Sequence, residues 1–211
     1  MNERVPVAPA QVKKNRWLLL RLLATFVVPF VVGDLAYKLG WYQGGKTNNG
    51  QLIDPPAAFA GFKARGQDGT AVTADFVKAN WWLLYVMPEQ CGQACRNRLF
   101  QMRQIRKALG KESERVRPLI VLTSALAPET EALLGKEFAD FARVEAAAGD
   151  IDQALANVLA NGASAGNLFV MDPMGWLMLT YGPEVDEKTS VVKAEDVLND
   201  LKKLLKASRI G

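Results

Sequence analysis

The chain has 211 residues, 49% of them hydrophobic, which is enough for one domain of ordinary size plus an appendage. Its formal net charge is +4, and it contains no histidine. Without imidazole, Ser-His-Asp and Cys-His catalysis are excluded, as are zinc, copper and iron sites that require a histidine ligand. Neither a GxxxxGKS/T nor a GxGxxG string occurs, so nothing in the sequence supports nucleotide binding.

An apolar segment near the N-terminus predicts a transmembrane anchor over residues 17–37, preceded by a cytoplasmic tail of residues 1–16. Residues 22–33 carry no charge, and with its flanks the segment reaches the ~20 residues that cross a bilayer. Arg21 lies about one turn from the start, where its side chain can snorkel to the headgroups. Aromatic residues flank the segment as an interfacial belt would, namely Trp17, Tyr37, Trp41 and Tyr42.

Basic residues are denser before this segment than after it. Lys13, Lys14 and Arg16 precede it closely. The positive-inside rule therefore predicts a cytoplasmic N-terminus, with the rest of the chain outside the cytoplasm. A cleaved signal peptide is the alternative, but no clear small-x-small cleavage site follows the apolar run, which favours an uncleaved anchor. Residues 38–58, rich in Gly, Asn and Pro, are expected to form a linker.

From residue 59 to residue 211 strand-like and helix-like runs alternate. We expect strands at 62–65, 81–87, 117–124 and 142–148, and a hairpin over 167–182 with its turn at 172–175. We expect helices at 96–109, 127–141, 150–162 and 193–210. Strand–helix alternation predicts a parallel core, and the closing hairpin predicts antiparallel strands. The fold class is therefore α/β, with a central mixed sheet flanked by helices.

The only two cysteines, Cys91 and Cys95, follow the buried strand 81–87 and open a helix. Open α/β folds place their sites at such strand ends. On a helical turn, Cα atoms four residues apart lie about 6 Å from each other, inside the ~4.4–6.8 Å window of a disulfide. A thiolate at Cys91 would be stabilised by the helix N-terminus and by the positive charges of Arg96 and Arg98.

These residues resemble a known family. A buried strand, a CxxxC pair opening a helix, and the late hairpin FVMDPMGWLMLTYG look like the thioredoxin-fold Sco/SenC proteins. Those proteins are membrane-anchored, face the bacterial periplasm or the mitochondrial intermembrane space, and help build the copper centre of cytochrome c oxidase. The resemblance covers roughly Phe59 to the C-terminus and implies a thioredoxin-like fold. It implies that Cys91 and Cys95 correspond to the family's two copper-binding, redox-active thiols.

The copper-ligating histidine of that family has no counterpart in this chain. It stands nine residues before the proline of the turn, and counting back from Pro173 gives Ser164. The prolines often found around the family's CxxxC are also missing, since this segment reads CGQAC. The resemblance therefore implies a diverged member with a two-sulfur site. Such a site suits disulfide exchange or Cu(I) and suits Cu(II) poorly.

Three interpretations of the cysteine pair stay open. It exchanges a disulfide with a partner, it carries Cu(I) with a thioether from Met87 or Met174, or it is a structural remnant in a scaffold that binds oxidase subunits. The sequence leaves open whether the protein is an oxidoreductase or a non-enzymatic chaperone. A structural zinc site would lack two ligands, and the Pro-x-x-x-Thr/Ser-x-x-Cys context of peroxiredoxins is absent.

Other features have both a functional and a structural interpretation. Basic residues on or beside the helix after the cysteines form either a face for an acidic partner or anionic headgroups, or an ordinary solvated face: Arg96, Arg98, Arg103, Arg106, Lys107 and Lys111. Asp172 either borders the site or makes a turn. Packing in the core or in an interface is expected for Trp81, Trp82 and Trp176.

Together these observations predict a single-pass protein of the inner membrane of a Gram-negative bacterium, with a thioredoxin-like domain over residues 59–211 in the periplasm. The resemblance alone implies a role as an assembly factor for cytochrome c oxidase, acting by thiol–disulfide exchange or Cu(I) handling at Cys91 and Cys95. The expected partners are oxidase subunits or other copper or thiol assembly factors, and not nucleic acid. Copper(I) is the one candidate cofactor or cargo.

Overall fold

The protein is described here by a computed structural model that covers residues 9–41, 47–159, 164–183 and 187–208. The chain divides into two compact units, Met1–Thr47 and Asn48–Gly211. The first unit is built around one helix, α1 (Pro9–Lys38), which contains Pro29. Within it, Asn15–Lys38 is long and apolar enough to cross a membrane, and none of its most apolar stretch is buried against the protein. This helix fits a single-pass membrane protein.

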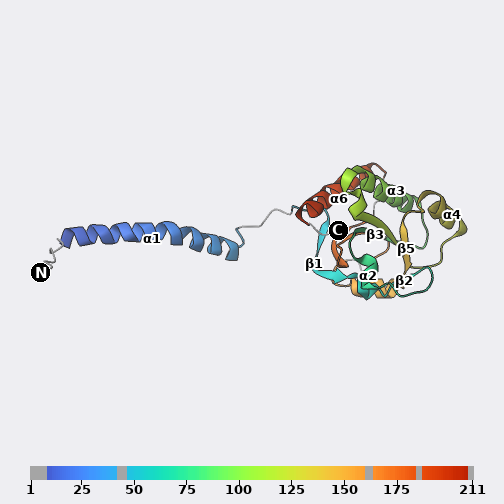
Figure 1. Ribbon diagram of the computed structural model, residues 1–211, viewed down its shortest axis with the longest axis horizontal. Helices are drawn as coiled ribbons and strands as arrows, with labels where there is room; N and C mark the ends of the chain where they lie inside the picture. The colour runs from blue at the N-terminus through green and yellow to red at the C-terminus, as the bar shows by residue number, and fades with distance from the viewer. Residues whose placement is uncertain (1–8, 42–46, 160–163, 184–186, 209–211) are drawn as a thin grey trace. The chain divides into compact units, whose positions relative to one another are not determined.

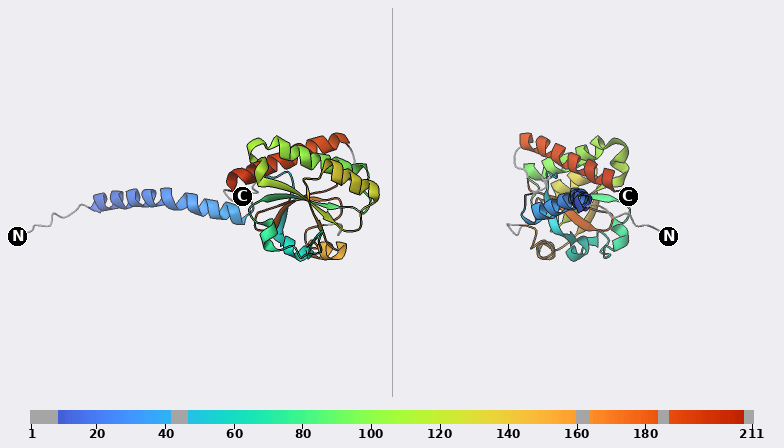
Figure 2. Two further views of the ribbon diagram at one scale, coloured as in Figure 1. Left: turned by 45° about the vertical axis from the view of Figure 1, so that its right-hand side comes forward. Right: turned by 90° about the vertical axis from the view of Figure 1, so that its left-hand side faces the viewer.

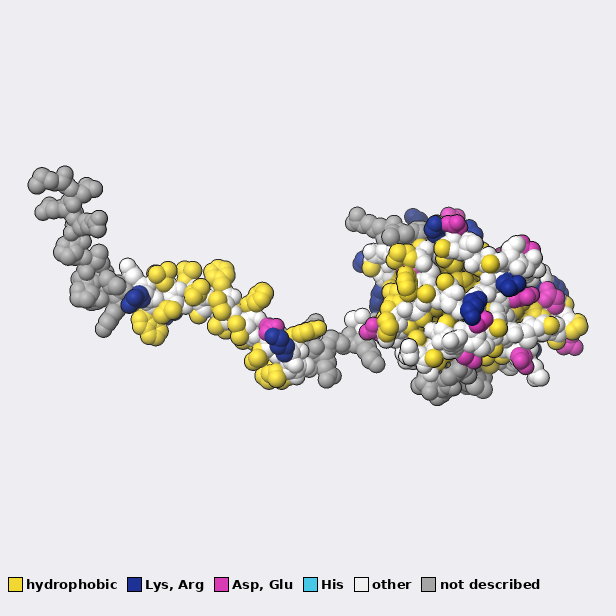
Figure 3. All heavy atoms as spheres, turned by 90° about the horizontal axis from the view of Figure 1, so that it is seen from below, with side chains coloured by type: hydrophobic (Ala, Val, Ile, Leu, Met, Phe, Trp, Pro, Cys, Tyr) yellow, Lys and Arg dark blue, Asp and Glu magenta, His cyan; other side chains and the backbone are white. Residues whose placement is uncertain are grey.

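Charged side chains of α1 lie toward its two ends. The Arg21 guanidinium stands over the Trp17 ring, 5.9 Å from its centroid. Asp34 and Lys38 form an ion pair one turn apart, with 2.9 Å between Oδ2 and Nζ. Between them the helix presents exposed apolar side chains, which are yellow in Figure 3. An exposed apolar surface of this length is stable in lipid and unfavourable in water.

The second unit is a seven-stranded sheet in the order β1-β7-β6-β3-β4-β5-β2 (Figure 1). The strands are β1 (Gln51–Ala58), β2 (Arg65–Gly66), β3 (Trp81–Met87), β4 (Val116–Leu122), β5 (Ala142–Glu145), β6 (Leu168–Met171) and β7 (Trp176–Tyr181). Strands β3, β4 and β5 are parallel, and the remaining pairings are antiparallel. The predicted α/β class with a mixed central sheet is confirmed.

Helices cover both faces of this sheet, as Figure 2 shows. They are α2 (Ala74–Val77), α3 (Gln93–Ala108), α4 (Pro128–Glu137), α5 (Ala148–Ala154) and α6 (Glu187–Ala207), with the 3-10 helices η1 (Phe59–Phe62) and η2 (Gly110–Arg115). One core contains side chains of α3, α4 and α6, and the other contains side chains of η1, α2 and α5. Figure 2 shows α3 and α6 side by side on one face.

Strand β3 is the centre of both cores. Its residues alternate between the two faces, so that Leu83 and Tyr85 contribute to one core and Leu84 and Val86 to the other. Every residue of β3 is buried. A strand covered by helices on both sides is apolar throughout, which explains why the continuous run 81–87 predicts it correctly.

The beginning of the domain differs from the prediction. We expected a linker through residue 58, but Gln51–Ala58 forms β1, at the edge of the sheet beside β7. Its two adjacent prolines argue against a strand in the sequence, yet proline is tolerated on an edge strand, and the register with β7 is irregular between Leu52 and Ala57. The compact unit accordingly starts at Asn48 rather than at Phe59.

The predicted strand at 62–65 is also wrong. Phe59–Phe62 forms η1, and only Arg65–Gly66 pairs as β2. Phe59 and Phe62 are both buried, with ring centroids 5.3 Å apart. Two apolar side chains three residues apart lie on the same side of a 3-10 turn, whereas a strand would place them on opposite faces.

The other elements match their predicted positions with shifted ends. Helix α3 begins at Gln93 rather than near Arg96, and therefore includes Cys95. Helix α5 ends at Ala154, earlier than expected, and residues 160–162 of the prediction lie outside the described residues. Residues 142–145 do form a strand, β5.

Candidate functional site

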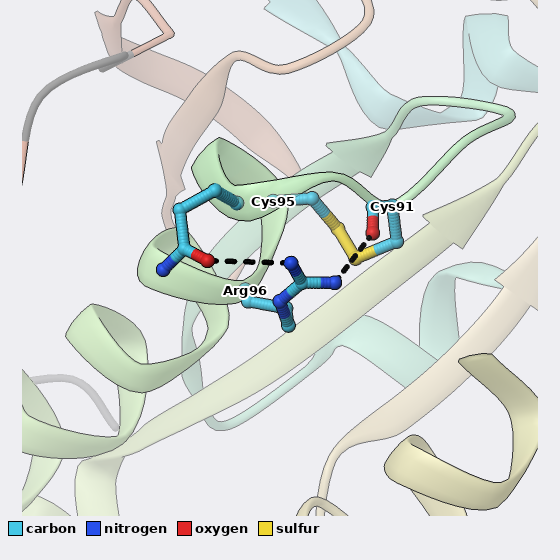
Figure 4. Close-up of a disulfide and its surroundings, with 4 residues drawn as sticks. Cys91, Cys95 and Arg96 are labelled. Carbon is cyan, nitrogen blue, oxygen red and sulfur yellow. Dashed lines mark hydrogen bonds between the residues drawn. A yellow bond between two sulfur atoms is a disulfide. The ribbon is translucent and has the colours of Figure 1, made fainter. Parts of the chain in front are cut away.

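Cys91 and Cys95 are joined by a disulfide where β3 leads into α3 (Figure 4). Gly92 is the N-cap of α3, so Cys91 lies just before the helix and Cys95 is its third residue. Their Cα atoms are 5.0 Å apart, closer than the ~6 Å of two cysteines within one helix. The difference arises because Cys91 has left the helical path.

The two sulfur-bearing residues differ in exposure. Cys95 is 2% exposed and belongs to the core beneath α3. Cys91 is partly exposed and packs against the same core from its rim. Thiol–disulfide exchange requires in-line access of an incoming thiolate to one sulfur. Cys91 is therefore the member of the pair that a partner can reach.

The charged surroundings of the disulfide come from the first turns of α3. The Arg96 guanidinium donates to the Cys91 carbonyl oxygen at 3.3 Å and to Gln93 Oε1 at 3.2 Å, as Figure 4 shows. The first turn of α3 contains no acidic residue. After reduction, the helix N-terminus and Arg96 both favour the thiolate over the thiol.

The predicted basic face of α3 is largely used within the fold. Arg98, which we expected beside the thiolate, is buried and donates to the side-chain oxygen of Gln101 and to the carbonyl oxygen of Gly182. Arg103 stacks over two aromatic rings and approaches Glu137. Arg106 forms an ion pair with Asp140 at 2.9 Å. The structural interpretation therefore holds for Arg98, Arg103 and Arg106, while Arg96 lies at the site. Lys107 and Lys111 are exposed, and a functional role for them stays a prediction.

Tyr85 lies fully buried in β3, close to Arg98. Burial raises the pKa of its phenol to about 12, and the positive charge of Arg98 opposes that rise. The phenol is neutral at physiological pH. The sequence shows only an apolar run here, so it gives no sign that a tyrosine and an arginine are buried near each other beneath α3.

Ser164 lies at the same end of the sheet as the cysteines. Gly166 donates from its backbone N–H to the Val86 carbonyl oxygen at 2.8 Å, which places this segment beside the carboxyl end of β3. Ser164 is buried, and its backbone N–H donates to Asp152 Oδ1 at 3.0 Å. Its correspondence to the histidine of the Sco/SenC proteins stays a prediction.

The hairpin turn lies at the opposite end of β3. Met171, just before the turn, pairs with Trp82 near the start of β3 in an antiparallel register. The turn therefore lies beside the amino end of β3. Asp172 Oδ1 accepts from the backbone N–H groups of Met174 and Trp176, at 2.9 and 2.8 Å. Asp172 therefore stabilises the turn and does not border the cysteines. Met174 is excluded as a thioether ligand for the same reason.

The predictions for the tryptophans and for Met87 have different outcomes. Trp81 and Trp82 are buried, as expected, and Trp82 Nε1 donates to the Val77 carbonyl oxygen at 2.9 Å. Trp176 is 42% exposed, so it is not a core residue. Met87 is buried among the core side chains beneath α3.

The candidate site offers two sulfur atoms as metal ligands. Among the described residues, no group of three or more His, Cys, Asp or Glu side chains is placed to hold a metal ion. The two sulfurs are bonded to each other here, so they become available to a metal only after reduction. Two thiolates match the low coordination and softness of Cu(I), not the needs of zinc.

A family model described as transmembrane-like, thioredoxin-like, C-terminal domain matches residues 81–208. No curated protein matches the chain at a significant level. Apo Sco1 from Thermus thermophilus is 19% identical, with a TM-score of 0.53 over 77% of this chain and 99% of its own. Yeast Sco1 with copper bound is 15% identical, with a TM-score of 0.48 over 75% and 95%. A putative thiol:disulfide interchange protein DsbE from Chlorobium tepidum is 17% identical, with a TM-score of 0.47 over 72% and 97%.

The match to the Thermus protein confirms the expected Sco/SenC-like thioredoxin fold. At this level of identity it shows a shared fold. The family model spans more than half of the chain and includes the strand β3, both cysteines and the closing hairpin and helix. The chain therefore belongs to the family of transmembrane-like, thioredoxin-like C-terminal domains.

Proposed function

We propose that this protein exchanges disulfides with a partner protein through Cys91 and Cys95. The observation that carries the proposal is the disulfide at the β3–α3 junction, with one accessible cysteine and one buried cysteine. The helix N-terminus and Arg96 add the electrostatic support that a thiolate needs.

The exchange proceeds in two balanced steps. A thiolate of a reduced partner attacks Cys91 Sγ, the bond between the two cysteines breaks, and Cys95 leaves as a thiolate that takes up a proton. A second thiolate of the partner then attacks the mixed disulfide and releases Cys91. The partner loses two electrons and two protons and gains a disulfide, and this protein becomes a dithiol. The reverse sequence oxidises this protein.

Carriage of Cu(I) is the second candidate. The dithiol form presents two soft ligands at the site, and Cu(I) is stable with two sulfur ligands. The ion would be cargo that is passed on, not a resident cofactor. The resemblance of the CxxxC segment to the Sco/SenC proteins favours this role.

We assign the cellular setting on the same basis. Lys13, Lys14 and Arg16, which closely precede the apolar segment 17–37, support a cytoplasmic N-terminus and a periplasmic domain in the bacterial inner membrane. The resemblance supports a role in assembly of cytochrome c oxidase, with oxidase subunits or other copper or thiol assembly factors as partners. A scaffold that binds oxidase subunits without any thiol chemistry is the competing role.

One set of measurements separates these roles. The full chain in detergent is reduced and then titrated with Cu(I) and, separately, with thiol–disulfide buffers, alongside Cys91→Ser and Cys95→Ser. Stoichiometric Cu(I) binding lost in both variants supports the carrier, and a reversible disulfide without copper uptake supports the exchange protein. If both variants still support oxidase assembly in cells, the scaffold is correct.

Membrane orientation has its own test. A phosphatase that is active only outside the cytoplasm is fused to the C-terminus of the full chain. The proposed orientation predicts an active fusion. An inactive fusion made at normal levels would contradict a periplasmic domain.

A further inference from the structure

A cavity lined by charged, hydroxyl and apolar side chains opens at the carboxyl ends of the parallel strands β4 and β5, outside the cysteine site. Its volume is about 490 Å³, within the ~300–1,000 Å³ typical of small-molecule sites. In open α/β sheets, ligands bind beyond the carboxyl ends of the strands. The residues that line it and carry the argument are Lys63, Arg65, Thr123, Ser124, Glu145 and Asp150.

Two side chains of opposite charge at this cavity are exposed to solvent and form no ion pair with each other. Arg65 in β2 and Glu145 in β5 are register partners across an antiparallel pair, so their side chains leave the same face of the sheet. Both are exposed. Neither has an ion-pair partner within the part of the chain that the structure describes. A ligand that carries both charges can satisfy both.

The other two charges fix the wall of the cavity. Lys63 Nζ lies 2.7 Å from Asp150 Oδ1, which joins the segment before β2 to helix α5. Lys63 has left-handed backbone angles, with φ of 48°, an unfavourable conformation for a residue with a side chain. Such conformations persist where surrounding contacts enforce them, and they occur often in binding sites. The ion pair connects this turn, two residues before Arg65, to helix α5.

Hydroxyl and apolar groups complete the lining. Thr123 Oγ1 donates to the Met87 carbonyl oxygen at 3.4 Å, which leaves its lone pairs free to accept from a ligand. Ser124 is exposed. Ala125 and Ala146 contribute apolar surface to the lining.

We propose that this cavity binds a small zwitterion with an α-amino-acid head group. The carboxylate lies against the Arg65 guanidinium, the ammonium group lies against Glu145, and the ligand's side chain contacts Ala125 and Ala146. Lys63 and Asp150 neutralise each other, whereas Glu145 opposes a simple anion and Arg65 opposes a simple cation, so a ligand of balanced charge fits best. The binding does not use the cysteines and is independent of the proposed function.

The test measures binding of L-alanine, L-leucine, L-glutamate and L-lysine to the full chain in lipid nanodiscs by equilibrium dialysis. The amino acid that binds best is then compared with its N-acetyl form and its amide, each of which lacks one of the two charges. We expect at least one amino acid to bind, and each modified form to bind about tenfold more weakly or worse. No binding of any of the four up to about 10 mM would overturn the proposal, as would equal binding of either modified form.

Matched variants identify the site. Arg65→Gln and Glu145→Gln should each weaken binding by about tenfold or more, because each removes one charge-assisted contact. Arg117→Gln is the control, since Arg117 is also exposed but lies at the amino end of β4, away from the cavity. Unchanged binding in the Arg65 and Glu145 variants, with the disulfide and fold intact, would place the ligand elsewhere and refute this site.

Discussion

Arg96 folds back along the first turn of its own helix and donates a hydrogen bond to the carbonyl oxygen of Cys91, at 3.3 Å. The same guanidinium holds Gln93 at 3.2 Å, and Gln93 in turn donates to Asn97 Oδ1 at 2.8 Å. These hydrogen bonds link neighbouring side chains on the surface of α3 to the loop that carries the accessible cysteine. Arg96 therefore positions Cys91 and supplies a positive charge near its sulfur.

Replacing Arg96 should slow the chemistry of Cys91. In the reduced protein, Arg96→Ala removes a cation that favours the thiolate, and only the thiolate reacts with alkylating agents. We expect the alkylation rate at neutral pH to fall by roughly three- to tenfold. Lys107→Ala, an exposed basic residue near the other end of α3, should leave the rate unchanged. Equal alkylation rates for the wild type, Arg96→Ala and Lys107→Ala would show that Arg96 does not activate Cys91.

The two cysteines should differ in reactivity because they differ in exposure. With glutathione disulfide, Cys95→Ser should accumulate a stable mixed disulfide at Cys91, since no second thiol remains to resolve it. Cys91→Ser should react at least about tenfold more slowly, because Cys95 is buried in the core. Intact-mass measurements over time distinguish the two. Comparable rates in both variants would show that the exposure difference does not govern the reaction.

Alkaline pH should destabilise the domain through Tyr85. Its phenol ionises near pH 10 in the unfolded chain, whereas burial raises the pKa to about 12 in the folded domain. Above pH 10 the unfolded state loses the proton first, so the stabilisation is complete below pH 10 and is lost as pH rises toward 12. The unfolding free energy of the wild type relative to Tyr85→Phe should fall by roughly 2–3 kcal/mol over this range. A constant difference between the two proteins, measured by denaturant titration at each pH, would contradict the assignment.

Asp200 of α6 ties the beginning of the domain to its end. It is 2% exposed and accepts from the backbone N–H groups of Asn49 and Gly50, at 2.7 and 2.9 Å, and from the Tyr181 hydroxyl at 2.9 Å. Asp200→Ala leaves these donors without their acceptor, and we expect a loss of about 2–4 kcal/mol of unfolding free energy. Asn199→Ala, on the exposed side of the same helix, should change it by less than about 0.5 kcal/mol. Denaturant titration followed by tryptophan fluorescence measures both.

Gly50 has a second constraint at this junction. A Cβ atom there would come within 2.5 Å of the Tyr181 ring. The ring is held by its hydrogen bond to Asp200 and cannot move aside without losing it. The contact explains why the chain enters the domain through a glycine, and it shows that residues 48–50 are part of the fold rather than of a linker.

Periodicity predicts the centre of this domain well and its edges poorly. The run 81–87 and the alternation after it predict the parallel strands and the helices between them, because these elements are buried on defined faces. The prolines of β1 indicate a loop, so the sequence does not predict this strand. They are tolerated because β1 lies at the edge of the sheet beside β7, and that position is known only from the assembled sheet. Strand β2 has two residues, too few for any pattern to show.

The candidate site, too, can be predicted only in part from the sequence. Two cysteines between a buried strand and a helix predict the position of the disulfide, because the local chain geometry alone brings them together. The sequence offers Arg98 as a nearby charge, because it follows the cysteines closely in the chain, and Met174 as a candidate thioether ligand. Arg98 instead turns inward to bond Gly182, and antiparallel pairing carries Met174 to the far end of β3. The charged cavity beside β5 combines residues more than 80 positions apart, so no local motif could reveal it.

The most direct test of the central claim is a redox titration of the full chain in detergent. The protein is equilibrated in buffers of varied oxidised and reduced glutathione, quenched with an alkylating agent, and its free thiols are counted by intact mass. The account predicts one reversible two-electron transition in which both thiols of Cys91 and Cys95 appear together, approached equally from the oxidised and the reduced side. A disulfide that stays intact across the whole range of buffers, or that does not re-form after reduction, would contradict a role in thiol–disulfide exchange.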